Sequence, residues 1–331
     1  MTTPIVICDD SSFARKQMAR SLPGGWDVEI SFAEHGKEAV EAIKAGKADI
    51  LFLDLNMPVM DGYEVLEAIR KEDLPTMVLV VSGDIQPEAH KKVTSLGALD
   101  FIKKPVTTEK ITEILTKFGI ISEAQPQSES ELARFDDQDV ALVDLVQEVV
   151  NVSMGQAGNQ LASLLSTFIH LPVPKVHLTA YKNLQDVLAS KDITSLTGVT
   201  QGFNGSGIAG EAVLLVNDDS FPHMAKLMQY EDNSQGNNDL EVLMDLSGIL
   251  TGACLNGIAE QLDLELSYSH PVILGRKQPL APLLGKHGAE QQILAIEIDY
   301  SIPDHKVECD LILILTEDSI PALSERAGYL K

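Results

Sequence analysis

Short apolar runs alternate with amphipathic helical stretches along the first 120 residues. The apolar runs span 4–8, 27–32, 49–54, 77–82 and 98–102. Repeated strand–helix units of this kind predict a doubly wound parallel sheet. Function in such sheets lies at the carboxyl ends of the strands. We therefore expect an α/β first domain of five parallel strands, with its reactive residues along one edge.

Polar residues occupy the predicted strand ends. Asp9 and Asp10 end the first strand, Asp54 the third and Ser82 the fourth, while Lys104 follows the fifth. Three carboxylates at one edge repel each other, and a hard cation such as Mg²⁺ relieves that repulsion. A nearby ammonium and hydroxyl would complete a site for a phosphoryl group.

With these residues, the sequence resembles the receiver domain of two-component response regulators from residue 4 to about 119. The segments that carry the resemblance are CDDSS, FLDLNMPVMDG, VVSGD and FIKKP. The resemblance implies a flavodoxin-like five-stranded sheet. It also implies that Asp54 accepts a phosphoryl group from a sensor histidine kinase.

The same resemblance implies roles for the neighbours of Asp54. Mg²⁺ would be bound by Asp9, Asp10, Asp54 and the carbonyl of Asn56. Ser82 and Lys104 would bind the phosphoryl group, and Phe101 would be the aromatic switch residue. The Lys104–Pro105 peptide bond is expected to be cis.

The composition changes after residue 121. Residues 122–139 are polar and acidic, and they lack strand-like alternation, which is typical of a linker. We expect a receiver domain over 1–121, an acidic linker over 122–137 and a second domain over 138–331.

The second domain contains two similar helical stretches, 144–165 and 241–262, offset by 97 residues. Asp144 corresponds to Glu241, Glu148 to Asp245 and Gly155 to Gly252, whereas Asn151 corresponds to Gly248. This similarity predicts an internal duplication with pseudo-twofold symmetry.

Strand-like runs follow each of the two helices, over 176–184, 211–217, 264–274, 291–300 and 307–315. They predict an α+β domain with a shared antiparallel sheet and both helices on one face. GSGIAG (205–210) fits a dinucleotide-binding pattern, but that pattern needs a helix after it. A strand-like run follows instead, so we expect a β-hairpin or bulge.

Polar residues of the first helix form one stripe. At about 100° per residue, Asp144, Glu148, Asn151 and Gly155 fall within roughly 60°. This spacing resembles the motif of the CheC/CheX/FliY family of phosphatases that act on phosphorylated receiver domains. The resemblance implies that Glu148 and Asn151 are catalytic, and that the second copy, with Asp245 and Gly248, is degenerate because it lacks the amide.

The amide suggests the chemistry. A carboxamide can donate to and accept from a water held in line with phosphorus. The resemblance implies this role for Asn151, and it implies that Glu148 pairs with the receiver lysine. We expect a phosphoaspartate phosphatase in chemotaxis or related two-component signalling, regulated by its own receiver. Its substrate would be another phosphorylated receiver protein or its own receiver. The alternative is a non-enzymatic docking module for a chemotaxis or flagellar partner.

The composition of the chain limits the classes of binding partner that we expect. The net charge of −24 disfavours nucleic acid and anionic membranes. We find neither a signal peptide nor an apolar run of about 18 residues, so we expect a cytoplasmic protein without membrane insertion. Three separated cysteines predict no disulfide framework, and His305 with Cys309 lacks partners for a transition metal. Related phosphatases include monomers and dimers, so a homo-oligomer remains open.

Overall fold

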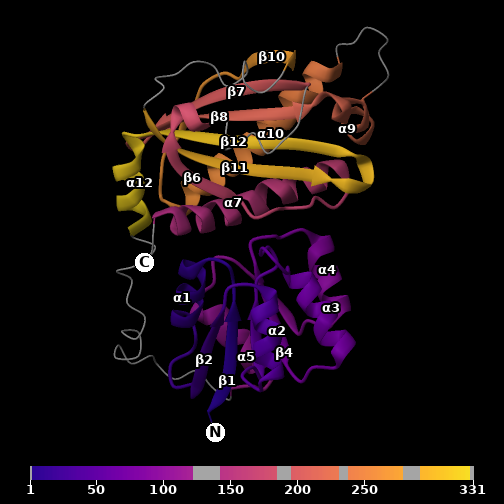
Figure 1. The fold of residues 1–331 in the computed structure, drawn as a ribbon, viewed down its shortest axis with the longest axis vertical. Coiled ribbons are helices and arrows are strands. Elements are labelled where there is room, and N and C mark those ends of the chain that lie inside the picture. Colours follow the sequence, from indigo (N-terminus) through magenta and orange to yellow (C-terminus); the bar gives the residue numbers. More distant parts are fainter. Residues whose placement is uncertain (1, 122–141, 185–194, 231–237, 279–290, 329–331) are drawn as a thin grey trace. The chain divides into compact units, whose positions relative to one another are not determined.

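A computed structural model describes residues 2–121, 142–184, 195–230, 238–278 and 291–328 (Figure 1). The predicted linker, 122–137, lies outside these described residues. The chain divides into two compact units, and its two sheets lie in different units. We call them the five-stranded unit and the seven-stranded unit, and we describe each by itself.

The five-stranded unit is a parallel sheet with strand order β2-β1-β3-β4-β5. Its strands are β1 (Thr3–Cys8), β2 (Val28–Ala33), β3 (Ile50–Leu53), β4 (Met77–Ser82) and β5 (Asp100–Lys103). Its helices are α1 (Ser12–Arg20), α2 (Gly36–Lys44), α3 (Gly62–Glu72), α4 (Pro87–Leu96) and α5 (Thr108–Lys117). The predicted doubly wound α/β fold is confirmed.

Alternation along the strands divides the apolar core of this unit into two layers. Val6 and Leu51 belong to a buried cluster with residues of α2, α3 and α4. Their neighbours Ile7 and Phe52 belong to a second cluster with residues of α1 and α5. Because both faces of the sheet are covered, the strands read as nearly continuous apolar runs.

The seven-stranded unit is antiparallel, with strand order β10-β7-β8-β12-β11-β6 and the short β9 paired to β7. Its strands are β6 (Lys175–Ala180), β7 (Leu196–Gly205), β8 (Ile208–Asn217), β9 (Ser267–Tyr268), β10 (Val272–Gln278), β11 (Gln292–Ile302) and β12 (Val307–Thr316). The predicted antiparallel sheet is confirmed.

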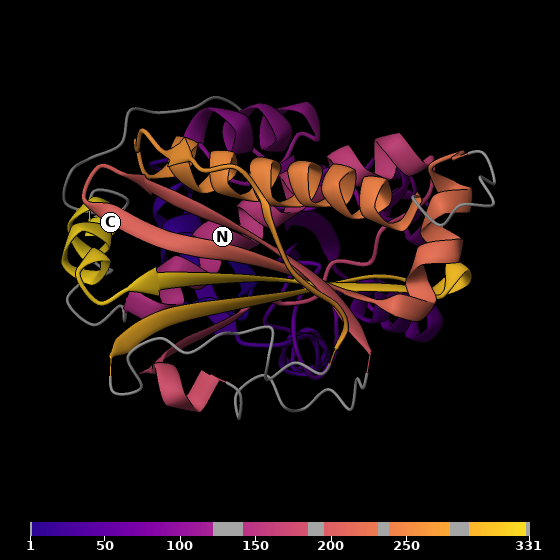
Figure 2. The ribbon, with the colours of Figure 1, turned by 90° about the horizontal axis from the view of Figure 1, so that it is seen from above.

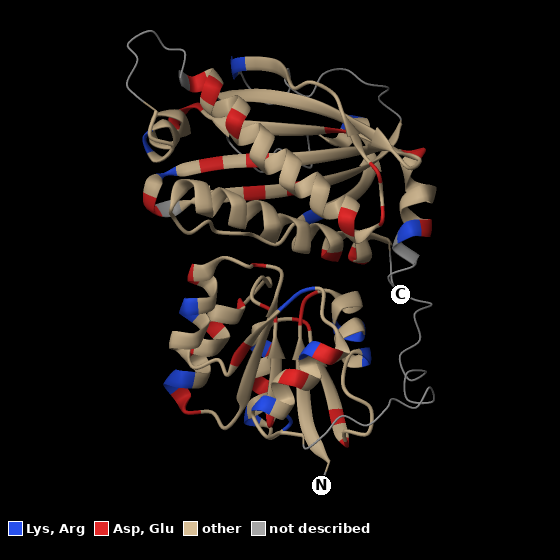
Figure 3. Ribbon diagram, turned by 180° about the vertical axis from the view of Figure 1, so that it is seen from behind, with Lys and Arg blue, Asp and Glu red and all other residues tan. Residues whose placement is uncertain are grey.

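The helices of this part of the chain are α7 (Leu142–Leu165), α9 (Phe221–Leu227), α10 (Asn238–Gln261) and α12 (Ser319–Gly328). Short 3₁₀ turns span Tyr181–Asn183, Asp218–Ser220 and Pro303–His305. Residues of α7 from Val149 onward belong to the seven-stranded unit. Figures 2 and 3 show α10 lying along one face of the sheet. The two predicted long helices are therefore present.

Two strand predictions need correction, and one strand was not predicted. The run 176–184 ends as a strand at Ala180, where the 3₁₀ turn begins. The run 264–274 is split into β9 and β10, with His270–Pro271 between them, since proline cannot donate to a ladder. β7 was not predicted, because its glycines and polar residues weaken the apolar alternation.

The GSGIAG segment forms the predicted hairpin between β7 and β8. Gly205 pairs with Ile208, and Ser206 and Gly207 between them both have positive φ, 51° and 80°. Two such residues form the hairpin turn that matches the twist of antiparallel strands. The segment is therefore structural, and the dinucleotide-binding interpretation is excluded by the absence of a following helix.

Among the described residues, α10 alone is long and apolar enough to cross a membrane by length and composition. The sequence analysis did not single it out, because glycines and Asp245 interrupt its apolar residues. In the structure 61% of its apolar stretch is buried, as in the core helix of a globular protein. The absence of membrane insertion stays a prediction.

Candidate functional sites

The strand ends of the five-stranded unit bring the predicted receiver residues together. The parallel register pairs Cys8 with Leu53 and Ser82 with Lys103. Two backbone hydrogen bonds extend this register past the strands: Asp54 N donates to Cys8 O at 2.9 Å, and Lys104 N donates to Ser82 O at 3.0 Å. The sheet itself therefore aligns residues that are far apart in the sequence.

Lys104 is the electrostatic centre of this edge. Its Nζ lies 2.7 Å from Asp9 Oδ2 and 3.1 Å from Asp54 Oδ1. Burial by itself would lower the pKa of Lys104, but the carboxylates of Asp54 and Asp9 raise it well above its ordinary range. Lys104 is therefore a permanent cation beside Asp54.

The carboxylates outnumber the cation. Burial raises the pKa of Asp54, Lys104 opposes this, and Asp9 and Asp10 add to the rise. Burial and the neighbouring Asp9 carboxylate raise the pKa of Asp10 to about 7. When ionised, Asp9, Asp10 and Asp54 exceed the charge of Lys104 by two units, so the edge has a deficit of positive charge that suits a divalent cation.

The acids are not arranged as a closed metal site. Among the described residues, no group of three or more His, Cys, Asp or Glu side chains could hold a metal ion as it stands. Lys104 lies against both Asp9 and Asp54, and the backbone amide of Asn56 donates to Asp54 Oδ2 at 2.8 Å. The carboxylate and carbonyl oxygens nevertheless match the ligands that Mg²⁺ prefers. Binding of the ion would require the acidic side chains around Lys104 to rearrange.

Ser82 and Phe101 occupy the neighbouring strand ends. Ser82 Oγ accepts a hydrogen bond from the amide of Asp84 at 3.1 Å. Phe101, on β5, is half-buried and meets the ring of His90 on α4 edge-on, with centroids 5.6 Å apart. The cis Lys104–Pro105 bond is confirmed. Phe101 therefore connects the strand edge to α4.

The predicted phosphatase residues lie on α7, which follows the five-stranded sheet in the sequence. Glu148 and Asn151 are three positions apart on this uninterrupted helix, with Asp144 one turn earlier. Ser153, half a helical turn round from this stripe, faces α10: its Oγ accepts from Gln261 Nε2 at 2.8 Å. The polar stripe of α7 therefore points away from α10.

The corresponding stripe of α10 is exposed and open. Glu241, Asp245 and Gly248 are exposed. A Cβ placed on Gly248 or Gly252 would meet no atom within 4 Å. Asp245 accepts a hydrogen bond from the hydroxyl of Tyr230, which raises the pKa of Tyr230 to about 12. No side-chain amide stands at the position equivalent to Asn151.

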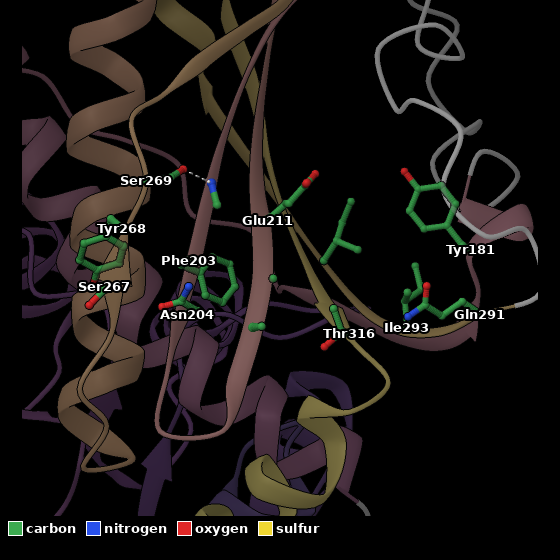
Figure 4. A pocket seen from close by; sticks show the side chains of 14 residues that line it. Tyr181, Phe203, Asn204, Glu211, Ser267, Tyr268, Ser269, Gln291, Ile293 and Thr316 are labelled. Atoms are coloured by element: carbon green, nitrogen blue, oxygen red, sulfur yellow. Dashed lines mark hydrogen bonds between the residues drawn. The ribbon is translucent and has the colours of Figure 1, made fainter.

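A pocket of about 510 Å³ lies on the sheet of the seven-stranded unit, and the sequence analysis missed it (Figure 4). Phe203, Ile293 and Ile314 give it an apolar floor, and Glu211 is the one charged side chain among its described lining residues. It joins strands that are distant in the sequence, so no local pattern could predict it. The lining residues that the structure describes include no nucleophile–base pair, and they support no catalytic assignment.

Comparison with known proteins places one part of the chain in a family. The family model for the response regulator receiver domain matches residues 5–116. Response regulator ORR41 of Oryza sativa subsp. japonica is 35% identical over 120 residues, covering 35% of this chain and 94% of that protein. Protein-glutamate methylesterase/protein-glutamine glutaminase 3 of Geobacter sulfurreducens is 38% identical over 113 residues, covering 34% of this chain but 30% of that protein.

Two solved structures are similar to parts of the chain. The receiver domain of NarL from Mycobacterium tuberculosis is 32% identical, with 35% of this chain and 95% of that chain covered and a TM-score of 0.33. FliY of Thermotoga maritima is 18% identical, with 57% and 97% covered and a TM-score of 0.43.

Proposed function

Since the chain belongs to the response regulator receiver family, we propose that it is a two-component signalling protein whose receiver is phosphorylated on Asp54 and whose seven-stranded unit, with α7, hydrolyses phosphoaspartate. The phosphoryl donor would be a sensor histidine kinase. The substrate would be a phosphorylated receiver, and the resemblance of α7 to the CheC/CheX/FliY motif supports a role in chemotaxis or a related pathway.

Charge at the strand edge supports the receiver assignment. Lys104 Nζ lies 3.1 Å from Asp54 Oδ1, where it would neutralise an oxygen of a phosphoryl group on that carboxylate. Asp9, Asp10, Asp54 and the carbonyl of Asn56 would hold Mg²⁺. When bound, the ion would offset phosphoryl charge that Lys104 alone cannot balance. Ser82 would donate its hydroxyl to another phosphoryl oxygen.

The polar stripe of α7 carries the phosphatase proposal. Glu148 and Asn151 lie on a helix whose opposite side is fixed to α10 through Ser153. A helix that carries a carboxylate and an amide one turn apart can enter a receiver site. There the Glu148 carboxylate would pair with the receiver lysine, and the Asn151 amide would orient a water molecule toward phosphorus.

Topology supports an internal duplication. Exchanging β6 with β10, β7 with β11 and β8 with β12 converts the order β10-β7-β8-β12-β11-β6 into its own reverse. The same exchange relates α7 to α10 and α9 to α12 in the chain order. We propose that one ancestral unit was duplicated, and that the copy bearing α10 lost hydrolysis when Gly248 replaced the amide.

A docking module is the second candidate. It is favoured by the open surface at Gly248, since a stripe without an amide can bind a partner and cannot position water. If both stripes serve only for docking, Asn151→Ala retains binding and the wild type hydrolyses nothing.

Regulation would act through the neighbours of Asp54. Phosphorylation adds charge beside Lys104 and Ser82, and Phe101 connects this edge to α4 through His90. We propose that the resulting rearrangement changes the phosphatase rate. Equal rates before and after phosphorylation of Asp54 would contradict this regulatory role.

The decisive experiment measures phosphate release from a separate phosphorylated receiver with Mg²⁺. The proteins compared are the wild type, Asn151→Ala and Asp54→Ala. We expect wild type and Asp54→Ala to accelerate phosphate release. Asn151→Ala should be slower than wild type by a factor of about 10²–10³, by analogy with other positioned amides.

Two other outcomes are informative. If no protein accelerates release in trans, but the wild type takes up phosphate and loses it only with Asn151 present, the substrate is the protein's own receiver. If phosphate release is never accelerated, in trans or on the protein's own Asp54, the phosphatase proposal is wrong and the docking module replaces it.

A further inference from the structure

α10 holds α7 at the turn that carries the polar stripe. Gln261 Nε2 donates to Val149 O at 2.9 Å and to Ser153 Oγ at 2.8 Å, with Gly257 O farther away at 3.3 Å. Ser153 Oγ in turn donates to Val149 O at 2.7 Å. Val149 directly follows Glu148 and stands two residues before Asn151, so these bonds fix the backbone between the two side chains.

Close helix packing reinforces the same point. A Cβ on Gly257 would lie 2.9 Å from Ser153 Cβ and 3.0 Å from Gln156 Oε1. Such separations are too short for any residue but glycine without movement of α7. Gly257 thus lets α10 approach within reach of the Val149 carbonyl, and Gln261 supplies the donor for it.

The equivalent residues of the two long helices do not form a second contact of this kind. At the offset of 97 residues, Gln261 corresponds to Leu164 and Gly257 to Gln160, while Ser153 corresponds to Leu250. Leu164 is 49% exposed and has no polar group to donate, whereas Leu250 is fully buried. The two copies therefore differ at the residues by which α10 contacts α7. They also differ at the amide position, where Asn151 corresponds to Gly248.

We propose that Gln261, with Ser153 and Gly257, is a positioning device for Asn151: the copy that lacks the amide has become the support of the copy that keeps it. This inference rests on the proposed phosphatase function. The bonds from Ser153 and Gln261 to the Val149 carbonyl fix the direction in which the Asn151 turn points. A catalytic amide must be held to within about 0.5 Å of its productive position.

Gln261→Leu tests the device, because leucine has similar volume and no donor. Its matched control is Leu164→Gln, the reverse change at the equivalent, half-exposed position of α7. We expect Gln261→Leu to lower kcat for phosphate release about tenfold, since small misplacements of a reacting group cost up to about 10², with KM within about twofold. Leu164→Gln should retain the wild-type kcat and KM.

A double-mutant comparison separates positioning from stability. In an Asn151→Ala background, Gln261→Leu should cause no further loss, because there is no amide left to misplace. A similar tenfold loss of kcat in the wild-type and Asn151→Ala backgrounds would mean that Gln261 only stabilises the fold. That result would overturn the positioning role.

Hydrogen exchange provides a readout that needs no activity. In the full-length protein, Gln261→Leu should speed amide exchange over residues 149–155, with exchange over the β11–β12 strands unchanged. If the wild type hydrolyses no phosphoaspartate, the proposed function fails, and this exchange still decides whether α10 holds α7. Unchanged exchange over 149–155 would overturn the inference.

Ser153→Ala is the second variant, should Gln261→Leu fail to fold. It removes the hydroxyl shared by Val149 and Gln261 while it leaves their direct bond. We expect a smaller loss of kcat, about threefold, with the same unchanged KM. No change in kcat and no change in exchange with Ser153→Ala would count against the device.

Discussion

The two candidate sites are carried by different elements, one by the edge of the five-stranded sheet and the other by helix α7. In the five-stranded unit, Asp9, Asp54 and Lys104 each follow a strand, and the parallel register aligns them to within ion-pair distance. Around the seven-stranded sheet, the candidate residues Glu148 and Asn151 share one helix, and the strands hold none of them. One site is assembled by a sheet edge, the other by the period of a helix.

The difference determines what each site depends on. A sheet edge is fixed by many backbone hydrogen bonds, so the position of Asp54 is insensitive to any single side chain. A helix face is fixed by whatever packs behind it, which for α7 includes Ser153, Gly257 and Gln261. Substitutions remote from the reacting groups should therefore disturb the helix site more than the sheet site.

The largest expected effect is at Asp54. Asp54→Asn should abolish phosphate uptake from a small-molecule phosphodonor, because an amide oxygen is not a nucleophile toward phosphorus. Asp61→Asn is the matched control: Asp61 caps α3 in the same loop, and asparagine caps helices equally well. Mass spectrometry of the intact protein would detect the phosphoryl group. Uptake by Asp54→Asn would place the acceptor elsewhere.

Glu148 should show the next largest effect, of a different kind. Glu148→Gln should raise KM for a phosphorylated receiver about 10–100-fold, the worth of one charge-assisted hydrogen bond, with a smaller change in kcat. Steady-state phosphate release at varied receiver concentration measures both constants. An unchanged KM would show that Glu148 does not dock the receiver. Asp144→Asn, one turn earlier, is the comparison for a peripheral acid.

Glycines of α10 offer opposite changes in stability. Gly257→Ala should destabilise the seven-stranded unit by about 1–3 kcal/mol, because its Cβ meets Ser153. Gly248→Ala should stabilise the same unit by about 1 kcal/mol, since its Cβ enters open space on the exposed face of α10. Denaturant unfolding of the full chain would compare the two variants. Equal effects would contradict the close approach of α7 and α10.

The smallest expected effect is at the surface of the five-stranded unit. Burial would raise the pKa of Asp100, but hydrogen bonds from Lys117 and the Phe101 amide lower it below its ordinary value. An acid with a lowered pKa stabilises the fold above its unfolded pKa and loses this contribution as pH falls through its folded pKa.

Lys117→Met should therefore cost at most about 1 kcal/mol at pH 7, because Lys117 is largely exposed and the pair is solvent-screened, and the cost should be smaller at pH 2. Thermal unfolding at the two pH values gives the difference, with Lys110→Met as a second surface lysine for comparison. A larger cost at pH 2 than at pH 7 would reverse the predicted sign.

Sequence patterns predicted most of the five-stranded unit. All five strands and the residues that follow them were placed correctly, because parallel strands covered on both faces are recognisable as apolar runs. The long helices α7 and α10 and the β7–β8 hairpin were predicted for similar reasons of local periodicity and turn chemistry. The predictions failed where local preference is weak, at the glycine-rich β7 and at the proline between β9 and β10.

By itself, the sequence determined which residues are chemically competent: acids, a lysine and a serine at strand ends, and a carboxylate and an amide one helical turn apart. It did so because strand and helix periods are local properties of the chain. Only the tertiary structure decided that Lys104 pairs with both Asp9 and Asp54, and that Gln261 holds the turn of α7 from behind. Those contacts join residues about 50 to 110 positions apart, and distances of that kind are set by packing, which no local pattern encodes.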